Sequence, residues 1–228
     1  MNLPNAITVA RIAASPLIAL LPFHSGAGSR LAAFVLFIAA AVTDYWDGHL
    51  ARTRNLVTDL GRLLDPLADK LLLVATLVPM YLLMHGDALL IPLRSFPTMR
   101  PPLAFVTPAG FVTLPLWIVL LVLGREAFMT VFRQVAARRG LVIAAIGPAK
   151  WKTTFQSIWV GAAYFWFFAA TFAERRDWEH AAGWRAFTHF NGIVGTVAMI
   201  GAVALTLWSL GLYLRRYGGA VVRPASRA

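Results

Sequence analysis

The sequence predicts an all-α integral membrane protein with about six transmembrane helices. Hydrophobic residues make up 59% of the 228 residues and charged residues only 14%, and the mean hydropathy is +0.67. Such a composition excludes the soluble globular class. The apolar stretches lack the strict alternation of barrel strands, and backbone groups in lipid must be satisfied internally, so helices are favoured over a barrel.

Six apolar runs are long enough to cross a bilayer, which takes about 20 residues per helix. They lie at residues 5–23, 31–48, 66–84, 103–123, 154–173 and 190–213. No internal repeat, linker or second domain divides them. We therefore expect a single polytopic membrane domain over residues 1–228, ending in a mobile basic tail at about 218–228.

The net charge of +11 is concentrated at helix ends and not in one soluble patch, which argues against nucleic-acid binding. By the positive-inside rule, loops rich in Arg and Lys stay in the cytoplasm. Three such segments lie on one side of the predicted topology, at residues 52–62, 125–152 and 215–227. We expect this side and the N-terminus to face the cytoplasm, as in a protein of the bacterial inner membrane.

A cluster of acidic residues interrupts this apolar chain. Five of the ten acidic residues fall between positions 44 and 69, and carboxylates near a membrane interior indicate a functional site. Helical steps of three and four residues bring Asp44 beside Asp47, and Asp65 beside Asp69. Four converging carboxylates repel one another unless cations neutralise them, and all-oxygen ligation is typical of Mg²⁺ or Mn²⁺. The alternative is a salt-bridge cluster with Arg52, Arg54, Arg62 and Lys70.

These acids belong to a longer pattern with small residues at fixed positions. The pattern is Asp44-x-x-Asp47-Gly48-x-x-Ala51-Arg52, followed by Gly61-x-x-x-Asp65-x-x-x-Asp69. It resembles the signature of the CDP-alcohol phosphatidyltransferase family, membrane enzymes that make phospholipids. The resemblance implies that family's fold, a pair of Mg²⁺ or Mn²⁺ ions, and a homodimer. It implies Asp44, Asp47, Asp65 and Asp69 as metal ligands, with Asp69 also as the general base. For the cytidine diphosphate group it implies Asp47, Gly48, Ala51, Arg52, Gly61 and Asp65.

A second polar set follows the fourth apolar run. It comprises Gly124-Arg125-Glu126, Arg133, Gly140 and Lys150-x-Lys152-Thr153-x-x-Gln156. Arginine and lysine side chains suit phosphate binding, although an ordinary cytoplasmic loop is also enriched in them. Together with Asn5, Thr8 and Arg11 near the N-terminus, the set is similar to the phosphatidylglycerophosphate synthases of that family. This similarity implies CDP-diacylglycerol as donor, CMP as leaving group, and glycerol 3-phosphate as acceptor, its phosphate held by Arg125, Arg133 and Lys152.

Other functions remain open at this point. Within the family, the acceptor alternatives are inositol phosphate, serine or a phosphatidyl lipid. An intramembrane prenyltransferase also uses Mg²⁺ and aspartates, but its acids come as two motifs far apart in the sequence. A cation transporter more often has paired halves with interrupted helices, and no second acidic segment exists here. The last two predicted helices carry no distinctive chemistry.

Overall fold

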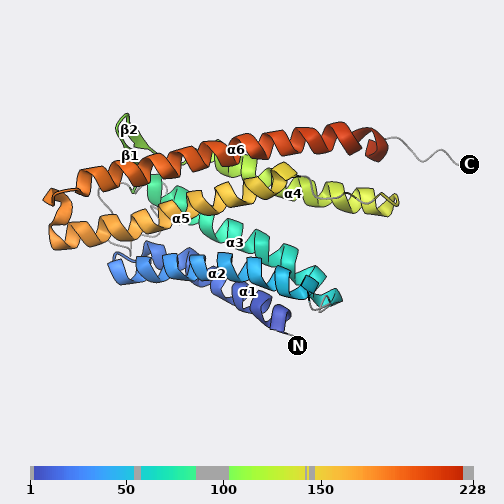
Figure 1. Ribbon diagram of the computed structural model, residues 1–228, viewed down its shortest axis with the longest axis horizontal. Helices are drawn as coiled ribbons and strands as arrows, with labels where there is room; N and C mark the ends of the chain where they lie inside the picture. Colours follow the sequence, from blue (N-terminus) through green and yellow to red (C-terminus); the bar gives the residue numbers. More distant parts are fainter. Residues whose placement is uncertain (1–2, 54–57, 86–102, 142, 144–146, 223–228) are drawn as a thin grey trace, which may run out of the picture.

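The computed structural model describes residues 3–53, 58–85, 103–141, 143 and 147–222 (Figure 1). Within these residues the chain forms six α-helices, two short 3₁₀ helices and one β-hairpin. Their bounds are α1 Leu3–Leu20, η1 Leu21–Phe23, α2 Ala27–Thr53, α3 Asp59–His85, β1 Phe105–Thr107, β2 Gly110–Val112, α4 Leu116–Arg138, α5 Gly147–Arg176, η4 Trp178–His180 and α6 Trp184–Val222.

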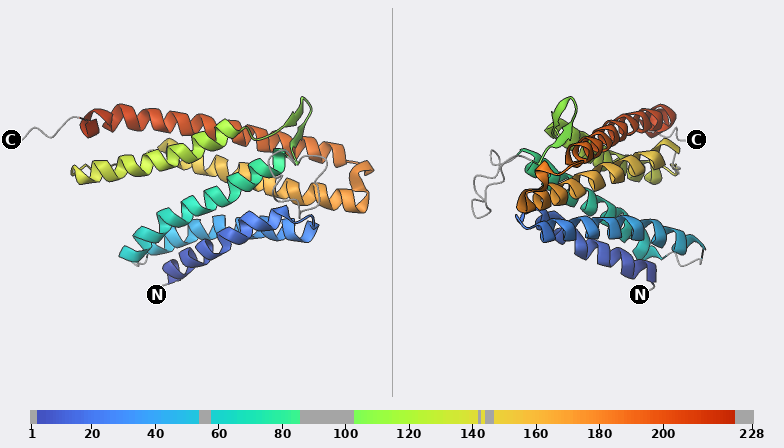
Figure 2. Two further views of the ribbon diagram at one scale, coloured as in Figure 1. Left: turned by 180° about the vertical axis from the view of Figure 1, so that it is seen from behind. Right: turned by 60° about the vertical axis from the view of Figure 1, so that its left-hand side comes forward.

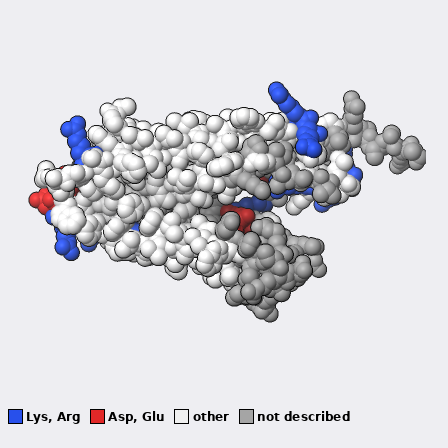
Figure 3. All heavy atoms as spheres, in the orientation of Figure 1, with Lys and Arg blue, Asp and Glu red and all other residues white. Residues whose placement is uncertain are grey.

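The prediction of an all-α membrane protein is confirmed in its main features. Four described helices contain stretches long and apolar enough to cross a membrane, at Pro4–Phe23, Ala27–Asp44, Leu63–His85 and Trp184–Gly219. Large apolar side chains such as Leu17, Val35 and Ile200 are exposed on the outside of the bundle, and Figure 3 shows a largely uncharged surface between the two ends. Such a surface is what contact with lipid requires, because lipid tails are themselves apolar.

The predicted helix at residues 103–123 is wrong at its start. Its first part is an antiparallel hairpin in which Phe105 pairs with Val112 and Thr107 with Gly110. Pro108 and Gly110 explain the turn, because proline lacks a backbone donor and Gly110 adopts a φ of 124° that other residues rarely reach. α4 begins only at Leu116.

The mobile basic tail was predicted at about residues 218–228. Residues 218–222 continue α6 as helix, and residues 223–228 lie outside the described part of the chain.

The helices form two groups that meet along α5. α1, α2 and α3 lie on one side of α5, and α4 and α6 lie on the other (Figures 1 and 2). The C-terminal ends of α2 and α4 and the N-terminal ends of α1, α3 and α5 all lie at one end of the bundle (Figure 1). Both polar sets of the sequence are therefore brought to the same end.

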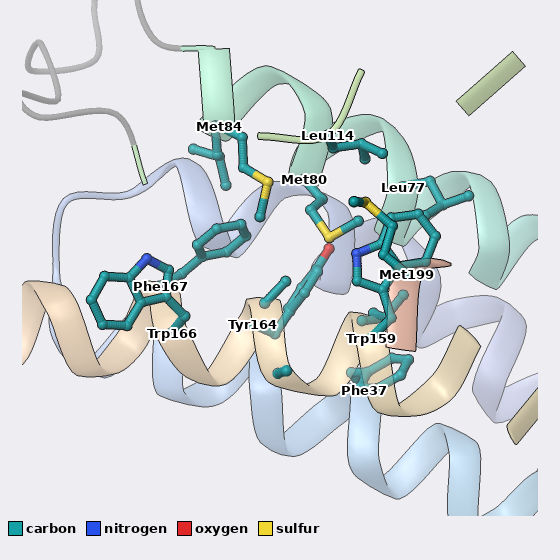
Figure 4. Close-up of a cluster of buried hydrophobic side chains, with 14 of the residues drawn as sticks. Phe37, Leu77, Met80, Met84, Leu114, Trp159, Tyr164, Trp166, Phe167 and Met199 are labelled. Atoms are coloured by element: carbon teal, nitrogen blue, oxygen red, sulfur yellow. The ribbon is translucent and has the colours of Figure 1, made fainter. Parts of the chain in front are cut away.

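Aromatic side chains of α5 fill the centre of the bundle. Trp159, Tyr164 and Phe167 are buried and pack against Leu77 and Met80 of α3 (Figure 4). The Tyr164 hydroxyl donates to the carbonyl of Ala75 at 3.2 Å, which satisfies a polar group that would otherwise be costly to bury. This packing fixes α3 relative to α5, and with them the two polar sets.

Candidate active site

The first turns of α1 lie against the acidic segment. Asn5, Thr8 and Arg11 are three residues apart, so they share one side of the helix, and all three residues are buried. This side faces α3, which packs against α1 and runs in the same direction (Figure 1). The polar side of an otherwise apolar helix is therefore directed at the predicted site.

Arg11 joins the two halves of the acidic segment. Its Nη1 forms an ion pair with Oδ1 of Asp44 on α2 and lies 3.6 Å from Oδ1 of Asp69 on α3. One turn earlier, the hydroxyl of Thr8 donates to Oδ1 of Asp65 at 2.9 Å. α1 thus contacts three of the four predicted metal ligands, and its arginine was not among the basic partners that the sequence suggested for them.

The carboxylates of Asp44 and Asp69 offer the oxygen donors that a divalent cation prefers, and both are accessible from solvent. The side chains of Asp44 and Asp69 are 44% and 61% exposed, and they approach one cationic group from different helices, as ligands of Mg²⁺ or Mn²⁺ do. Among the side chains that the structure describes, no group of three acidic or histidine residues is close enough to hold a metal ion. Asp47 follows Asp44 on α2, but its side chain lies outside the described residues. The same applies to two predicted neighbours of the cytidine diphosphate, Ala51 and Arg52.

Gly61 lies in the contact between α1 and the start of α3. The hydroxyl of Thr58 caps α3 by accepting the Gly61 backbone N–H at 3.0 Å, and Nδ2 of Asn5 donates to the same oxygen at 2.9 Å. A Cβ atom on Gly61 would lie 2.9 Å from Oδ1 of Asn5. The glycine of the motif therefore has a packing role: it admits Asn5 beside the N-terminus of α3.

The second polar set is organised around Glu126. Its Oε1 accepts hydrogen bonds from Nη1 of Arg125, at 2.7 Å, and from Nζ of Lys152 on α5. Nη2 of Arg125 donates to the hydroxyl of Ser209 on α6 at 3.0 Å. Arg125, Lys152 and Ser209 are all buried, where an unpaired charge would be strongly destabilising. These contacts tie α4, α5 and α6 together at the site.

Burial and pairing shift the pKa values of Glu126 and Lys152. Both residues lie outside the apolar runs that the sequence predicts to cross the membrane. Burial lowers the pKa of Lys152, although the attraction of Glu126 opposes this shift. For Glu126, burial alone would raise the pKa, but attraction to Lys152 and Arg125 outweighs it and holds the pKa below its ordinary value. Glu126 is therefore an anion at neutral pH.

Arg133 lies apart from these contacts. It is exposed, two turns beyond Arg125 on α4, and its Cζ lies 5.7 Å from the ring centroid of Tyr213 on α6, a cation–π geometry. The structure thus brings two of the three predicted phosphate-binding residues together and places the third further along the same helix.

One cavity connects the acidic and basic sets. Its volume is about 590 Å³, large enough for a small polar ligand. On one side it is lined by Arg11, Asp44, Asp69 and Lys70, and on the other by Glu126, Lys152, Thr153 and Gln156. Figure 3 shows acidic and basic atoms meeting in a hollow between the two groups of helices. A ligand in this cavity can therefore contact both sets at once.

Several residues of the site had no role in the sequence interpretation. Asn5, Thr8 and Arg11 were noted only as part of a resemblance, although a polar stripe on an apolar helix is itself a signal of function. Glu126 had no assigned role, and Ser209 belongs to a helix for which no chemistry was expected. Ser209 offers no such signal, because a serine in a long apolar helix is common.

The fold is that of a membrane-embedded protein, and the site places an acidic segment beside a basic pocket. The family model described as CDP-alcohol phosphatidyltransferase matches residues 1–208. The chain therefore belongs to the CDP-alcohol phosphatidyltransferase family and is an enzyme of this class, embedded in a membrane.

Similar proteins carry related names. A Bacillus subtilis (strain 168) protein named "CDP-diacylglycerol--glycerol-3-phosphate 3-phosphatidyltransferase" is 38% identical over 173 residues, which cover 71% of this chain and 75% of that protein. A Mycobacterium tuberculosis (strain ATCC 25618 / H37Rv) protein named "Probable phosphatidylglycerophosphate synthase" is 32% identical over 163 residues, 70% of this chain and 64% of that protein. A "Cardiolipin synthase (CMP-forming)" of Oryza sativa subsp. japonica is 34% identical over 160 residues, 68% of this chain and 43% of that protein.

Proposed function

We propose that this enzyme transfers the phosphatidyl group of CDP-diacylglycerol to glycerol 3-phosphate and releases CMP. The observation that carries the proposal is that Asp44 and Asp69 line one side of a cavity and Lys152 lines the other side of the same cavity. A phosphatidyl donor needs the acidic side with its cations, and a phosphorylated acceptor needs a buried cation nearby. The names of the Bacillus and Mycobacterium relatives agree with this pair of substrates.

The reaction is an in-line displacement at phosphorus. A hydroxyl oxygen of the acceptor bonds to the phosphatidyl phosphorus, and the bond from that phosphorus to the CMP oxygen breaks, so that CMP leaves with the electron pair. Asp69 would take the acceptor's proton as general base. Two Mg²⁺ or Mn²⁺ ions, held by Asp44, Asp47, Asp65 and Asp69, would supply charge neutralisation at the attacking and leaving oxygens.

The remaining residues orient the two substrates. Arg11 and Thr8 hold the carboxylates of Asp44, Asp69 and Asp65, which fixes the metal ligands before substrate arrives. The cytidine diphosphate would lie along Asp47, Gly48, Ala51, Arg52, Gly61 and Asp65. The acceptor phosphate would be held by Lys152 at the cavity wall, with Arg125 and Arg133 adding positive charge from α4.

The proposal includes the cellular setting. We place the enzyme in a bacterial inner membrane with the acidic segment at the cytoplasmic face, where cytidine nucleotides are available, and the positive-inside bias supports this orientation. By family resemblance we propose a homodimer.

A phosphatidyl lipid is the second candidate acceptor, because the similar rice protein is named as a cardiolipin synthase. An acceptor panel separates the candidates. Purified protein in detergent is given CDP-diacylglycerol and Mg²⁺, with glycerol 3-phosphate, glycerol, inositol phosphate, serine or phosphatidylglycerol, and CMP release and the lipid product are measured. We expect cation-dependent product from glycerol 3-phosphate and little from glycerol. Faster transfer to any other acceptor would overturn the substrate proposal while leaving the family membership intact.

A further inference from the structure

Glu126 has an unusual place for a carboxylate in a site that receives phosphate. It lies on the wall of the cavity that also contains Asp69, and its side chain is 26% exposed. A negative charge there repels an anionic ligand, so the presence of this carboxylate in the cavity wall needs an explanation. Pairing with Arg125 and Lys152 is one use, but that pairing does not require the carboxylate to reach the cavity.

The two oxygens of Glu126 are used unequally. The hydrogen bonds from Arg125 and Lys152 both end on Oε1. Neither of these two bonds reaches Oε2. An ionised carboxylate can accept hydrogen bonds on both of its oxygens and has no hydrogen to donate. Oε2 can therefore accept a hydrogen bond from a hydroxyl group in the cavity.

Glycerol 3-phosphate supplies such a hydroxyl. In the proposed reaction its terminal hydroxyl would react near Asp69 and its phosphate would pair with Lys152, two residues that line the same cavity, so its central hydroxyl would lie between these two groups. We propose that Glu126 determines acceptor specificity by accepting a hydrogen bond from this central hydroxyl through Oε2, while Oε1 holds Lys152 in place for the phosphate. This inference rests on the proposed function. It assigns to Glu126 the recognition of the central hydroxyl, which neither Asp69 nor Lys152 would contact.

The substitution Glu126→Gln separates this role from a purely structural one. The amide has one oxygen, and Arg125 and Lys152 both donate hydrogen bonds, so the oxygen takes the Oε1 position and the two structural contacts persist. The NH₂ group then takes the Oε2 position and donates where the native side chain accepts. Glu174→Gln makes the same chemical change on an exposed residue near the other end of α5 and is the matched control.

The first comparison uses 3-hydroxypropyl phosphate, which lacks the central hydroxyl. A hydrogen bond to a charged group corresponds to roughly a ten- to hundredfold preference, so the native enzyme and Glu174→Gln should favour glycerol 3-phosphate by that factor in kcat/KM. In Glu126→Gln the preference should fall below about threefold. Equal use of both acceptors by the native enzyme, or an undiminished preference in Glu126→Gln, would overturn the inference.

The second comparison uses dihydroxyacetone phosphate, in which a carbonyl replaces the central hydroxyl. A carbonyl only accepts hydrogen bonds, so it cannot form one with the native carboxylate but can accept one from the amide NH₂ of the variant. Use of this ketone relative to glycerol 3-phosphate should rise in Glu126→Gln. A structural defect alone would slow all acceptors by the same factor, and that result would also contradict the inference.

Two further arms keep the test decisive. If Glu126→Gln fails to fold, Glu126→Asp keeps the charge but shortens the side chain, and loss of the preference for glycerol 3-phosphate is again expected; a preserved preference would count against the inference. Calorimetric binding of the two phosphates to the native protein gives a readout without turnover, and equal affinities would reject Glu126 as the reader of the hydroxyl. Absence of any transfer to glycerol 3-phosphate by the native enzyme would instead refute the proposed function itself.

Discussion

At the residue scale, the site is built from charged side chains that hold one another in place. Arg11 gathers Asp44 and Asp69 from two helices, and Glu126 gathers Arg125 and Lys152 from two others. Each cluster places opposite charges in direct contact, which lowers the cost of keeping them in an apolar bundle. The same contacts position the groups that the proposed reaction needs.

Asp69 is the predicted general base, and its carboxylate lines the cavity. Asp69→Asn removes the proton acceptor but keeps the size of the side chain. We expect turnover to fall by at least the ~10²-fold typical of lost base catalysis, while CDP-diacylglycerol binding largely survives. Steady-state kinetics with a separate donor-binding measurement test this assignment, and near-native turnover would remove it.

Lys152 and Arg133 should differ in their effect on the acceptor. Lys152 is buried at the cavity wall, whereas Arg133 is exposed beside Tyr213. Losing a charge-assisted phosphate contact costs about 1.5–3 kcal/mol, so Lys152→Met should raise the KM for glycerol 3-phosphate roughly ten- to hundredfold, with a smaller rise in Arg133→Ala. The KM for the donor should change little in either variant. A rise in both KM values together would argue that these residues do not form an acceptor site.

Thr8 should act through Asp65, to which its hydroxyl donates. Thr8→Val keeps the shape of the side chain and removes this hydrogen bond, which is worth about 0.5–1.5 kcal/mol. Because the bond orients a predicted metal ligand, the Mg²⁺ concentration for half-maximal activity and the Kd for Mn²⁺ should rise about two- to tenfold. Thr188→Val, where the hydroxyl donates to the carbonyl of Arg185, is the control. Unchanged Mn²⁺ affinity in Thr8→Val would show that α1 does not position the ligand.

At the scale of elements, the docking of α1 on α3 is the main feature that the sequence did not reveal. The spacing of the four aspartates predicted two helices with paired carboxylates, because steps of three and four residues fix a helix face without any knowledge of neighbours. The partners of those carboxylates could not be predicted in the same way. The contact between Arg11 and Asp44 depends on how distant helices pack, as does the contact between Glu126 and Lys152.

The hairpin was missed for a different reason. Residues 103–123 are apolar enough for a membrane helix, and hydropathy alone does not separate a short buried strand from a helix. The turn at Pro108 and Gly110 was the available signal, since both residues interrupt a helix. Phe105, which is buried, packs where Gly195 of α6 leaves room for its ring, a contact that sequence patterns do not encode.

The contact between α1 and α3 can be tested at Gly61. A methyl group at this position would meet Asn5 at 2.9 Å, and such overpacking typically costs about 1–3 kcal/mol. We therefore expect Gly61→Ala to lower the thermal stability of the purified protein and its activity. Asn5→Ala in the same chain removes the clashing group, so the double variant should be less impaired than the sum of the two single changes. Strict additivity would contradict the packing role of Gly61.

At the scale of the whole molecule, the bundle collects its functional groups at one end. The C-terminal ends of α2 and α4 and the N-terminal ends of α3 and α5 lie there, and the connection from α5 to α6 lies at the other end (Figure 1). A substrate with a cytidine nucleotide and two acyl chains needs a site at the boundary between water and lipid, and a cavity that opens near the helix ends meets that need. The orientation of the protein in the membrane therefore determines whether the site faces the compartment that supplies the cytidine nucleotide.

The native chain contains no cysteine, so a single introduced thiol reports the orientation directly. Ala137→Cys lies in the last turn of α4, and Ala182→Cys lies between η4 and α6; both positions are exposed. In intact bacterial cells, a membrane-impermeant maleimide should label Ala182→Cys at once and Ala137→Cys only after permeabilisation, because the Arg-rich end stays in the cytoplasm. The reverse pattern would place Asp44 and Asp69 on the outer face, away from cytidine nucleotides. Since transfer from CDP-diacylglycerol returns CMP to the compartment that made the donor, that result would contradict the proposed cellular role even if the purified enzyme were active.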